Sequence, residues 1–248
     1  MTSADTEQPF QLPPRRRLGV LLRFPAGMAI TSWNYLWRIC ALHRSEAPGD
    51  SGDLPAAVPA GLLDRRSQCL EDGVGPMLHR RFSVLIEGSE AGPRELMGAV
   101  MADLNRAAPS SAAVFDKTAG HRGTVRVGDE YRVRMPGPWD GPVRVLHRDA
   151  VSFRFGTLRG HLEAGQIEFR ARDEGALLAF EIEAWSRAGD RLADLLYNRL
   201  RVSKEIQFNM WVHFCLRAAS IAGGRTRGGI TIDTRVVPAA DCREVSAG

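Results

Sequence analysis

Apolar side chains recur at every second position through one run after another between residues 124 and 187. The alternating apolar residues are Val125, Val127, Tyr131, Val133 and Met135, then Val143 and Val145, then Val151, Phe153 and Phe155, then Ile167, Phe169 and Ala171, and last Leu178, Phe180 and Ile182. Charged or polar residues stand between them, which is the period of a strand with one buried face and one face in water. Short turn signals separate the runs, so the pattern predicts an antiparallel meander whose outer side faces water.

A strand and a helix are predicted before this meander. Residues 82 to 86 alternate between apolar and polar side chains, as a first strand would. Pro93 then opens a segment with apolar residues at helical spacing, which ends before Pro109. Val114 and Phe115 predict one more short strand between this helix and the meander.

The longest helical segment, residues 190 to 222, follows the meander. Asp190 is suited to cap its N-terminus, and Gly223 and Gly224 end it. Its polar residues form a single stripe and apolar residues occupy the rest of its surface, so we expect this helix to be largely buried. The polar stripe persists through the most apolar part, which excludes a membrane-spanning helix.

The order of these elements predicts an α+β domain in which a curved antiparallel β-sheet wraps around the long C-terminal α-helix. Both layers have an apolar face, and each is the obvious partner for the other. Such a geometry often leaves an internal cavity, and the alternation turns the apolar residues of each run toward it. Trp185 shares its parity with Glu181 and Glu183 and is therefore predicted to point outward.

We assign residues 72 to 224 to this domain, and the rest of the chain divides into four segments. Residues 1 to 27 predict a disordered or weakly ordered leader. Residues 28 to 44 have the spacing of an amphipathic helix, which would form an N-terminal arm. Residues 45 to 71 are rich in Pro, Gly, Asp and Ser and predict a linker, and residues 225 to 248 predict a loose tail with one weak strand-like piece.

The amphipathic helix has two interpretations. Trp33 and Trp37 lie on its apolar face, so it either packs on its own domain or contacts a membrane surface through residues 15 to 44. The helix is short and its polar face is not rich in lysine or arginine, which favours packing on the domain.

The distribution of charges and the spacing of the cysteines limit the classes of partner that we expect. The chain has 33 Lys or Arg and 29 Asp or Glu, a formal net charge of +4. The basic residues are interleaved with acids, whereas a nucleic-acid-binding face needs clustered basic residues, so we expect no nucleic-acid partner. Cys40, Cys69, Cys215 and Cys242 lack the spacing of zinc ligands or of a disulfide framework. We therefore expect no metal site, and a reducing, cytoplasmic location.

Common catalytic and cofactor motifs are absent from the sequence. It has no G-x-S-x-G elbow, phosphate-binding loop, dinucleotide fingerprint or H-E-x-x-H helix. We therefore expect no cofactor, and a binding protein is favoured over an enzyme.

Four segments resemble an uncharacterised bacterial family of domains of unknown function in the SRPBCC superfamily, which includes START domains, polyketide cyclases and pollen allergens. These segments are residues 73–82 (GVGPMLHRRF), 137–142 (GPWDGP), 156–165 (GTLRGHLEAG) and 31–38 (TSWNYLWR). The resemblance implies a helix-grip fold with a cavity for a hydrophobic ligand. It carries over no catalytic residue.

The loop from Gly156 to Gly165 is the best candidate for chemistry. His161 and Glu163 combine an imidazole and a carboxylate that would suit proton transfer at a cavity mouth. Alternatively, Gly160 and Gly165 supply the turn geometry while His161 and Glu163 make structural hydrogen bonds or face water.

Two aromatic residues also have two interpretations each. Trp139 either gates a ligand at the cavity rim or covers the bottom of the barrel. Tyr131 points inward by parity, where it either presents its hydroxyl to a ligand or is a hydrogen-bonded core residue.

The leading functional hypothesis is a protein that binds a small or medium hydrophobic molecule, such as a lipid or a polyketide-like compound, between sheet and helix. The predicted ligand-binding residues are Tyr131, Val133, Trp139, Phe153, Phe155, His161, Phe169, Phe180, Ile182 and Met210. The second hypothesis is an enzyme of cyclase, aromatase or hydrolase type that requires His161, Glu163 or Tyr131 to converge in the same cavity. The third is a membrane-peripheral or partner-binding protein that acts through the N-terminal arm.

Overall fold

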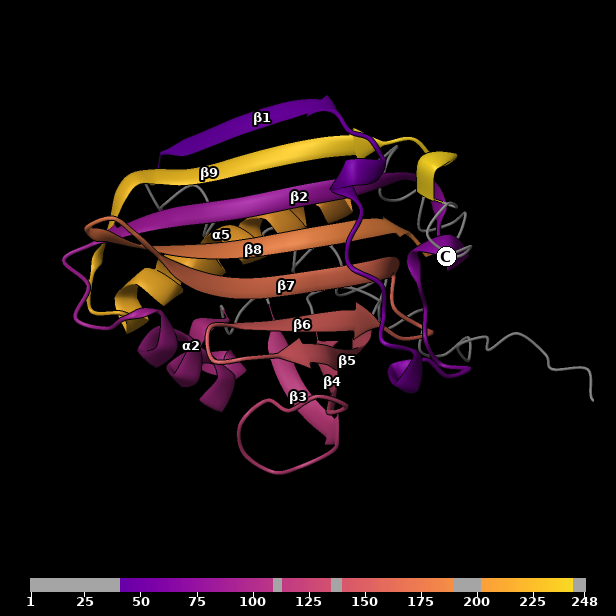
Figure 1. Cartoon of the computed structure of the whole chain (residues 1–248), viewed down its shortest axis with the longest axis horizontal. Helices are drawn as coiled ribbons and strands as arrows, with labels where there is room; N and C mark the ends of the chain where they lie inside the picture. The colour runs from indigo at the N-terminus through magenta and orange to yellow at the C-terminus, as the bar shows by residue number, and fades with distance from the viewer. Residues whose placement is uncertain (1–40, 109–112, 135–139, 190–201, 243–248) are drawn as a thin grey trace, which may run out of the picture.

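A computed structural model of the chain describes residues 41–108, 113–134, 140–189 and 202–242, without the side chains of residues 202–207. Within these ranges one nine-stranded sheet dominates, with the strand order β1-β9-β2-β8-β7-β6-β5-β4-β3 (Figure 1). The strands are β1 (Leu42–Pro48), β2 (Val74–Glu87), β3 (Val114–Ala119), β4 (Glu130–Arg134), β5 (Asp140–Arg148), β6 (Ser152–Thr157), β7 (Glu163–Glu174), β8 (Leu177–Ala188) and β9 (Arg225–Val237). The leader, most of the N-terminal arm, Trp139 and the first part of the long helix lie outside the described residues.

Helices accompany the sheet on its concave side. They are α2 (Pro93–Ala102), α3 (Leu104–Ala107) and α5 (Val202–Ile221), and the 3-10 helices η1 (Ser51–Asp53), η2 (Ala60–Leu62) and η3 (Leu70–Asp72) lie between β1 and β2. Pro93 takes the first position of α2, as predicted. Gly223 follows α5 with a φ of 72°, a left-handed conformation that glycine adopts without strain, and so ends the helix where the sequence predicted.

The predicted antiparallel meander is confirmed. Strands β3 to β8 pair in chain order from one to the next, each antiparallel to its neighbour. The register aligns Phe153 with Phe169, Phe169 with Ile182, and Ile182 with Phe82 in one row across four strands. Since directly opposite residues point to the same side of a sheet, this row forms one continuous apolar stripe.

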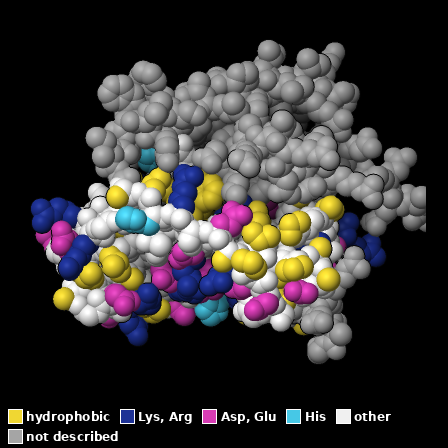
Figure 2. All heavy atoms as spheres, turned by 90° about the horizontal axis from the view of Figure 1, so that it is seen from above, with side chains coloured by type: hydrophobic (Ala, Val, Ile, Leu, Met, Phe, Trp, Pro, Cys, Tyr) yellow, Lys and Arg dark blue, Asp and Glu magenta, His cyan; other side chains and the backbone are white. Residues whose placement is uncertain are grey.

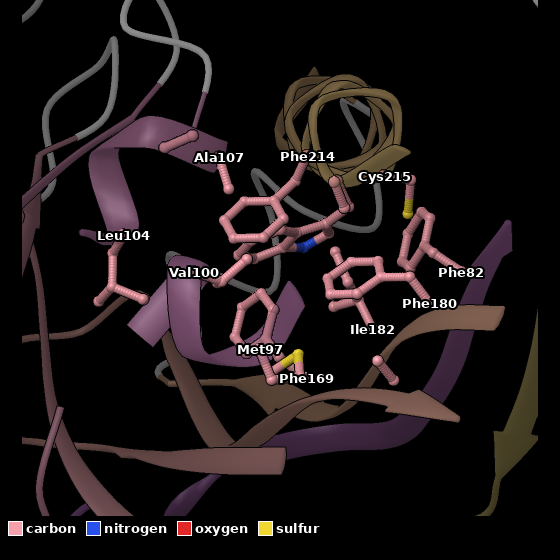
Figure 3. Close-up of a cluster of buried hydrophobic side chains, with 14 of the residues drawn as sticks. Phe82, Met97, Val100, Leu104, Ala107, Phe169, Phe180, Ile182, Phe214 and Cys215 are labelled. Carbon is pink, nitrogen blue, oxygen red and sulfur yellow. The ribbon is translucent and has the colours of Figure 1, made fainter. Parts of the chain in front are cut away.

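The long helix α5 lies against this stripe, behind β8 in the view of Figure 1. Phe214 of α5 points to the rings of Phe169 and Phe180, at centroid distances of 5.1 and 6.0 Å (Figure 3). Met97 and Val100 of α2 close the same cluster from the side. The predicted α+β class and the sheet curved around a C-terminal helix, the helix-grip arrangement, are therefore confirmed.

The predicted linker and tail were wrong in part, because both contribute strands. Residues 42 to 48, assigned to the end of a helix and the start of a linker, form β1 and pair parallel to β9. Residues 225 to 237, assigned to a loose tail with a strand-like piece at residues 230 to 237, form β9 between β1 and β2. The strand-like piece is confirmed, and the strand begins five residues earlier than predicted. Gly228 and Gly229 adopt φ of 74° and 89° beside a register shift, and this bulge breaks the alternation that would have revealed the first part of the strand.

The first run of the meander is shorter than predicted. Strand β4 begins at Glu130, and Val127 lies in a turn with 49% of its surface exposed. The carboxylate of Asp129 accepts hydrogen bonds from the backbone N–H groups of His121 and Arg126. These side-chain bonds take the place of a sheet ladder and stop the strand at this point.

Part of the outer face of the sheet is covered and not open to water as predicted. Residues 49–72, which we call the strap, cross it at one end of the sheet; Figure 1 shows the indigo chain after β1 running over the strands toward β6. Trp185 is on the outer face, as its parity predicted, but it is only 7% exposed and stacks on His79 at a centroid distance of 5.3 Å. The exposure of Trp185 was predicted wrongly because alternation shows on which face of the sheet a residue lies. It does not show which segment covers that face.

Candidate functional site

Eight of the ten predicted ligand-binding residues come together on the concave face, and His161 and Trp139 are not among them. Val133, Phe153, Phe155, Phe169, Phe180, Ile182 and Met210 are all at most 7% exposed and belong to one apolar cluster. We call the rings of Phe153, Phe155, Phe169, Phe180, Trp211 and Phe214 the aromatic core. Phe153 stacks on Phe169 at 4.8 Å, and Phe169 meets the ring of Trp211 at 5.6 Å. These side chains fill the space between sheet and helix by packing on one another.

An open cavity of about 450 Å³ lies at the margin of the aromatic core, where α2 and α3 face β3 and β4. We call it the edge cavity. It is lined by Met101, Ala102, Asp103, Leu104 and Asn105 on the helical side, and by Phe115, Lys117, Thr118, Ala119, Gly120, Arg122, Gly123 and Tyr131 on the side of the sheet. Tyr131 is 5% exposed and meets the ring of Phe155 edge-on at 5.5 Å, and Phe115 lies 6.3 Å from the same ring. The cavity therefore has the outermost rings of the apolar cluster as part of its wall.

A buried ion pair fixes the rim of the edge cavity. Lys117 Nζ donates to Asp129 Oδ2 at 2.7 Å and to the carbonyl oxygens of His121, Gly123 and Thr124 at 2.8 to 3.1 Å. Burial opposes both charges and is the largest single influence on each. The hydrogen bonds and charges around the two groups together outweigh it, so the pKa of Lys117 is raised and that of Asp129 is lowered. The loop around Gly123 is thereby tied to the strand that carries Lys117.

A second polar contact fixes the helical side of the edge cavity. Asn105 accepts from the backbone N–H of Phe115 at 2.7 Å and donates to its carbonyl oxygen at 3.0 Å. This amide pairs with β3 as a neighbouring strand would, and β3 is at the margin of the sheet. Both walls of the cavity are thus held by hydrogen bonds, which favours a cavity with a defined shape.

Polar residues lie at the end of the concave face. The sequence analysis singled out only Glu163 among them. Arg80 is 1% exposed, with its guanidinium 5.1 Å from the ring centroid of Phe208. Ser186 donates to Glu163 Oε1 at 3.3 Å, and Asn209 and His213 of α5 are also buried. Arg80 has the parity of the inward residues of β2, so extending the predicted strand back by one step would have found it.

His161 and Glu163 serve the turn between β6 and β7. The backbone N–H of Glu163 donates to His161 Nδ1 at 2.9 Å, and Gln68 donates to the carbonyl oxygens of both residues at 3.1 Å. Burial lowers the pKa of His161 below its usual value, although Glu163 opposes this. Gly160 supplies a φ of 98° to the turn. The contacts of His161 are those of the structural alternative.

The catalytic candidates do not converge with Tyr131. Strands β5 and β6 separate Tyr131 in β4 from Glu163 in β7, a distance along the sheet of about 14 Å at about 4.8 Å per strand. The edge cavity is lined by Tyr131 and not by His161 or Glu163. Of the three residues, only Tyr131 therefore lines this cavity.

Ion pairs hold the strap against the outer, convex face of the sheet. His79 Nε2 lies 2.7 Å from Glu183 Oε1, and its Nδ1 lies 3.1 Å from Asp53 Oδ1 of the strap. Arg81 and Arg170 also bind Glu183, at 2.9 and 2.6 Å. Burial opposes the charge of Glu183, but the hydrogen bonds of His79 and Arg81 lower its pKa to about 2.

The other end of the strap is held by Arg144. Its guanidinium donates to Asp64 Oδ2 at 2.6 Å, to Glu130 Oε1 at 2.8 Å and to the carbonyl oxygen of Leu62 at 2.7 Å. The hydrogen bond from Arg144 lowers the pKa of Asp64 to about 2. The strap is thus fastened to the sheet at both ends.

Among the described residues, no three His, Cys, Asp or Glu side chains lie close enough together to hold a metal ion. In those same ranges, no helix has both the length and the hydropathy needed to cross a membrane. On the face that Figure 2 shows, basic and acidic side chains are interspersed over the described part of the molecule.

Residues 81–218 match the model of a family described as "Domain of unknown function (DUF1990)". No curated protein matches the chain. The matched range runs from β2 to α5 and so includes both layers of the aromatic core.

Among solved structures, the chain is similar to Ara h 8.0201, with 10% identity and a TM-score of 0.33 over 54% of this chain and 98% of that chain. It is similar to a conserved protein from Geobacillus kaustophilus, with 10% identity and a TM-score of 0.39 over 60% and 99% of the two chains. It is also similar to the di-domain ARO/CYC StfQ from the steffimycin biosynthetic pathway, with 9% identity and a TM-score of 0.39 over 62% and 52%.

Proposed function

Because this chain belongs to the DUF1990 family, whose members are described as domains of unknown function, we propose its function from its site: it binds a small or medium apolar molecule of lipid or polyketide-like chemistry. The family agrees with the resemblance found in the sequence. The ligand would occupy the edge cavity and contact the outer rings of the apolar cluster.

One observation carries this proposal, namely that the edge cavity has apolar walls on two sides. Met101 and Leu104 line it from α2 and α3, and Phe115 and Tyr131 line it from β3 and β4. Its volume of about 450 Å³ is within the range of about 300 to 1,000 Å³ that is typical of small-molecule sites. Polar side chains complete the lining, namely Asp103, Asn105, Lys117, Thr118 and Arg122. A ligand with an apolar body and a few polar groups would match this mixture.

The polar groups of the cavity would orient the ligand. Burial raises the pKa of Tyr131 above its usual value although Lys117 opposes this, so the phenol is neutral at pH 7 and suited to donate a hydrogen bond. Lys117 is already bound to Asp129 and three carbonyl oxygens. Tyr131 is therefore the group we assign to a hydroxyl or carbonyl of the ligand.

The test is to fill the edge cavity and measure binding of a fluorescent probe that has an apolar aromatic part. Thr118 lines the cavity from the exposed end of β3, where a strand tolerates a large aromatic residue. Thr118→Trp should therefore fill the cavity without disturbing the core. We expect the full-length wild-type chain to bind 8-anilinonaphthalene-1-sulfonate, and Thr118→Trp to bind it at least about tenfold more weakly.

A matched control fills a different cavity of the same chain. Val58→Trp in the strap should leave binding of the anilinonaphthalene probe unchanged, since Val58 lies outside the edge cavity. Equal binding by wild type and Thr118→Trp would contradict the proposal. So would a wild-type chain that binds no probe and from which native mass spectrometry releases no apolar molecule.

A further inference from the structure

We propose a second small-molecule site on the convex face of the sheet, beneath the strap, for an uncharged molecule of about two fused rings with one hydrogen-bond donor. It is independent of the edge cavity, since it lies on the opposite face and is lined by different residues. We call it the strap cavity.

The strap cavity has a volume of about 380 Å³. Its apolar walls include Leu54, Val58 and Leu62 of the strap and Leu146 and Leu158 of the sheet side. An apolar cavity of about 150 Å³ is enough to hold a benzene molecule. The strap cavity therefore has room for about two fused rings.

The walls of the strap cavity are fixed in place. Gln68 and Thr157 exchange hydrogen bonds between strap and sheet, from Gln68 N to Thr157 O at 3.0 Å and from Thr157 Oγ1 to Gln68 O at 2.8 Å. The ion pairs of Asp53 and Asp64 hold the strap on either side of the cavity. With both sides held, the strap cannot close down on the sheet to fill the space.

A buried acceptor belongs to one of the residues that line this cavity. Gln166 lines it, is only 8% exposed, and donates from Nε2 to the carbonyl oxygen of Ala56 at 3.0 Å. That bond determines which side-chain atom is the oxygen, and Oε1 has no hydrogen-bond partner among the residues that the structure describes. Since buried polar groups nearly always have a partner, Oε1 points to a donor supplied by a bound molecule.

The charges around the cavity favour a neutral molecule. Arg144 lines it but is already bound to Asp64, Glu130 and the carbonyl oxygen of Leu62. Glu71 lines it as well. A charged ligand would have to replace an existing pair or meet a like charge, whereas a neutral N–H or O–H needs only Gln166.

Indole and 1-methylindole test this site as a matched pair, since they share two rings and only indole has an N–H. We expect indole to shift the amide resonances of Gly156, Leu158 and Gln166 in a heteronuclear NMR titration of the full chain. 1-Methylindole should bind about five- to tenfold more weakly, the effect of one lost hydrogen bond. In Gln166→Leu the two probes should bind with equal affinity.

Two variants separate this site from its alternatives. Val58→Trp should abolish the shifts by filling the strap cavity, and Thr118→Trp should leave them unchanged. Equal affinity of wild type for both probes would overturn the proposal, because Gln166 would then play no part. No shift at high indole concentration in a folded wild-type chain would also overturn it.

Discussion

The two faces of the sheet are buried in different ways. The concave face holds aromatic rings packed under α5, whereas the convex face holds carboxylates and guanidinium groups under the strap. Apolar packing is not directional, so the concave face tolerates any close fit of the right volume. The convex face depends on particular pairs, because a buried charge that loses its partner is costly. In this sheet, the alternation of side chains along each strand therefore determines the chemistry of each face. The segment that covers a face determines how deeply that face is buried.

The concave face should be the more sensitive to loss of volume. Phe169 is buried and contacts the rings of Phe153, Phe155, Trp211 and Phe214. Phe169→Ala should lower the free energy of unfolding by about 3 to 5 kcal/mol, since it removes a large apolar side chain and leaves a void. Urea denaturation followed by circular dichroism measures this directly. Leu63→Ala, at a residue 47% exposed, should change it by less than about 0.5 kcal/mol and serves as control. A loss below about 1 kcal/mol in Phe169→Ala would mean that the rings are loosely packed.

The convex face should be sensitive to loss of charge. Glu183→Gln keeps the shape of the side chain but leaves His79, Arg81 and Arg170 without their shared carboxylate. We expect it to lower the free energy of unfolding by about 2 to 3 kcal/mol at pH 7. Glu174→Gln, which alters an ion pair exposed at the end of β7, should have an effect below about 1 kcal/mol. Equal effects of the two variants would show that the buried network adds nothing beyond a surface pair.

The pH dependence of stability gives a second measurement on Glu183. Its pKa in the folded protein is about 2, below the usual 4.5, so its stabilisation is complete above pH 4.5 and is lost as the pH falls toward 2. Between pH 4.5 and pH 3 this loss is about 2 kcal/mol for Glu183. Asp64, also lowered to about 2, acts in the same direction. Glu183→Gln should flatten the wild-type decline below pH 4.5, and an unchanged decline would place its cause elsewhere.

The sequence predicted most of one face of this fold and little of the other. Strict alternation in β6 to β8 identified Phe153, Phe169 and Phe180 as interior residues, because a strand covered by one helix has a simple two-sided pattern. The strap has no such period, since its course is determined by separate ion pairs such as Asp53 with His79, between residues far apart in the chain.

The candidate sites were less predictable than the fold. Parity placed Tyr131 inward, but the edge cavity also depends on Asn105 and Lys117, whose partners are backbone groups of other segments. Gln166 was predicted to face water on an outer strand position, and it lies beneath the strap. These sites arise where segments distant in sequence meet, which local patterns do not reveal.

The smallest effect on stability is expected at the contact between strap and sheet, and it tests whether the two faces unfold independently. Asp53→Ala removes the carboxylate that binds His79 and should lower the free energy of unfolding by only about 1 kcal/mol, since the pair is partly exposed. Its main effect should be local: amide hydrogen exchange should speed up in the strap, while α5 and the strands of the aromatic core keep their protection. Asp173→Ala, at an exposed position of β7, should leave the strap unchanged. If exchange increased equally in the strap and in α5, the two faces would unfold as one unit, and the strap would be part of the core's cooperative structure rather than a cover fastened to it.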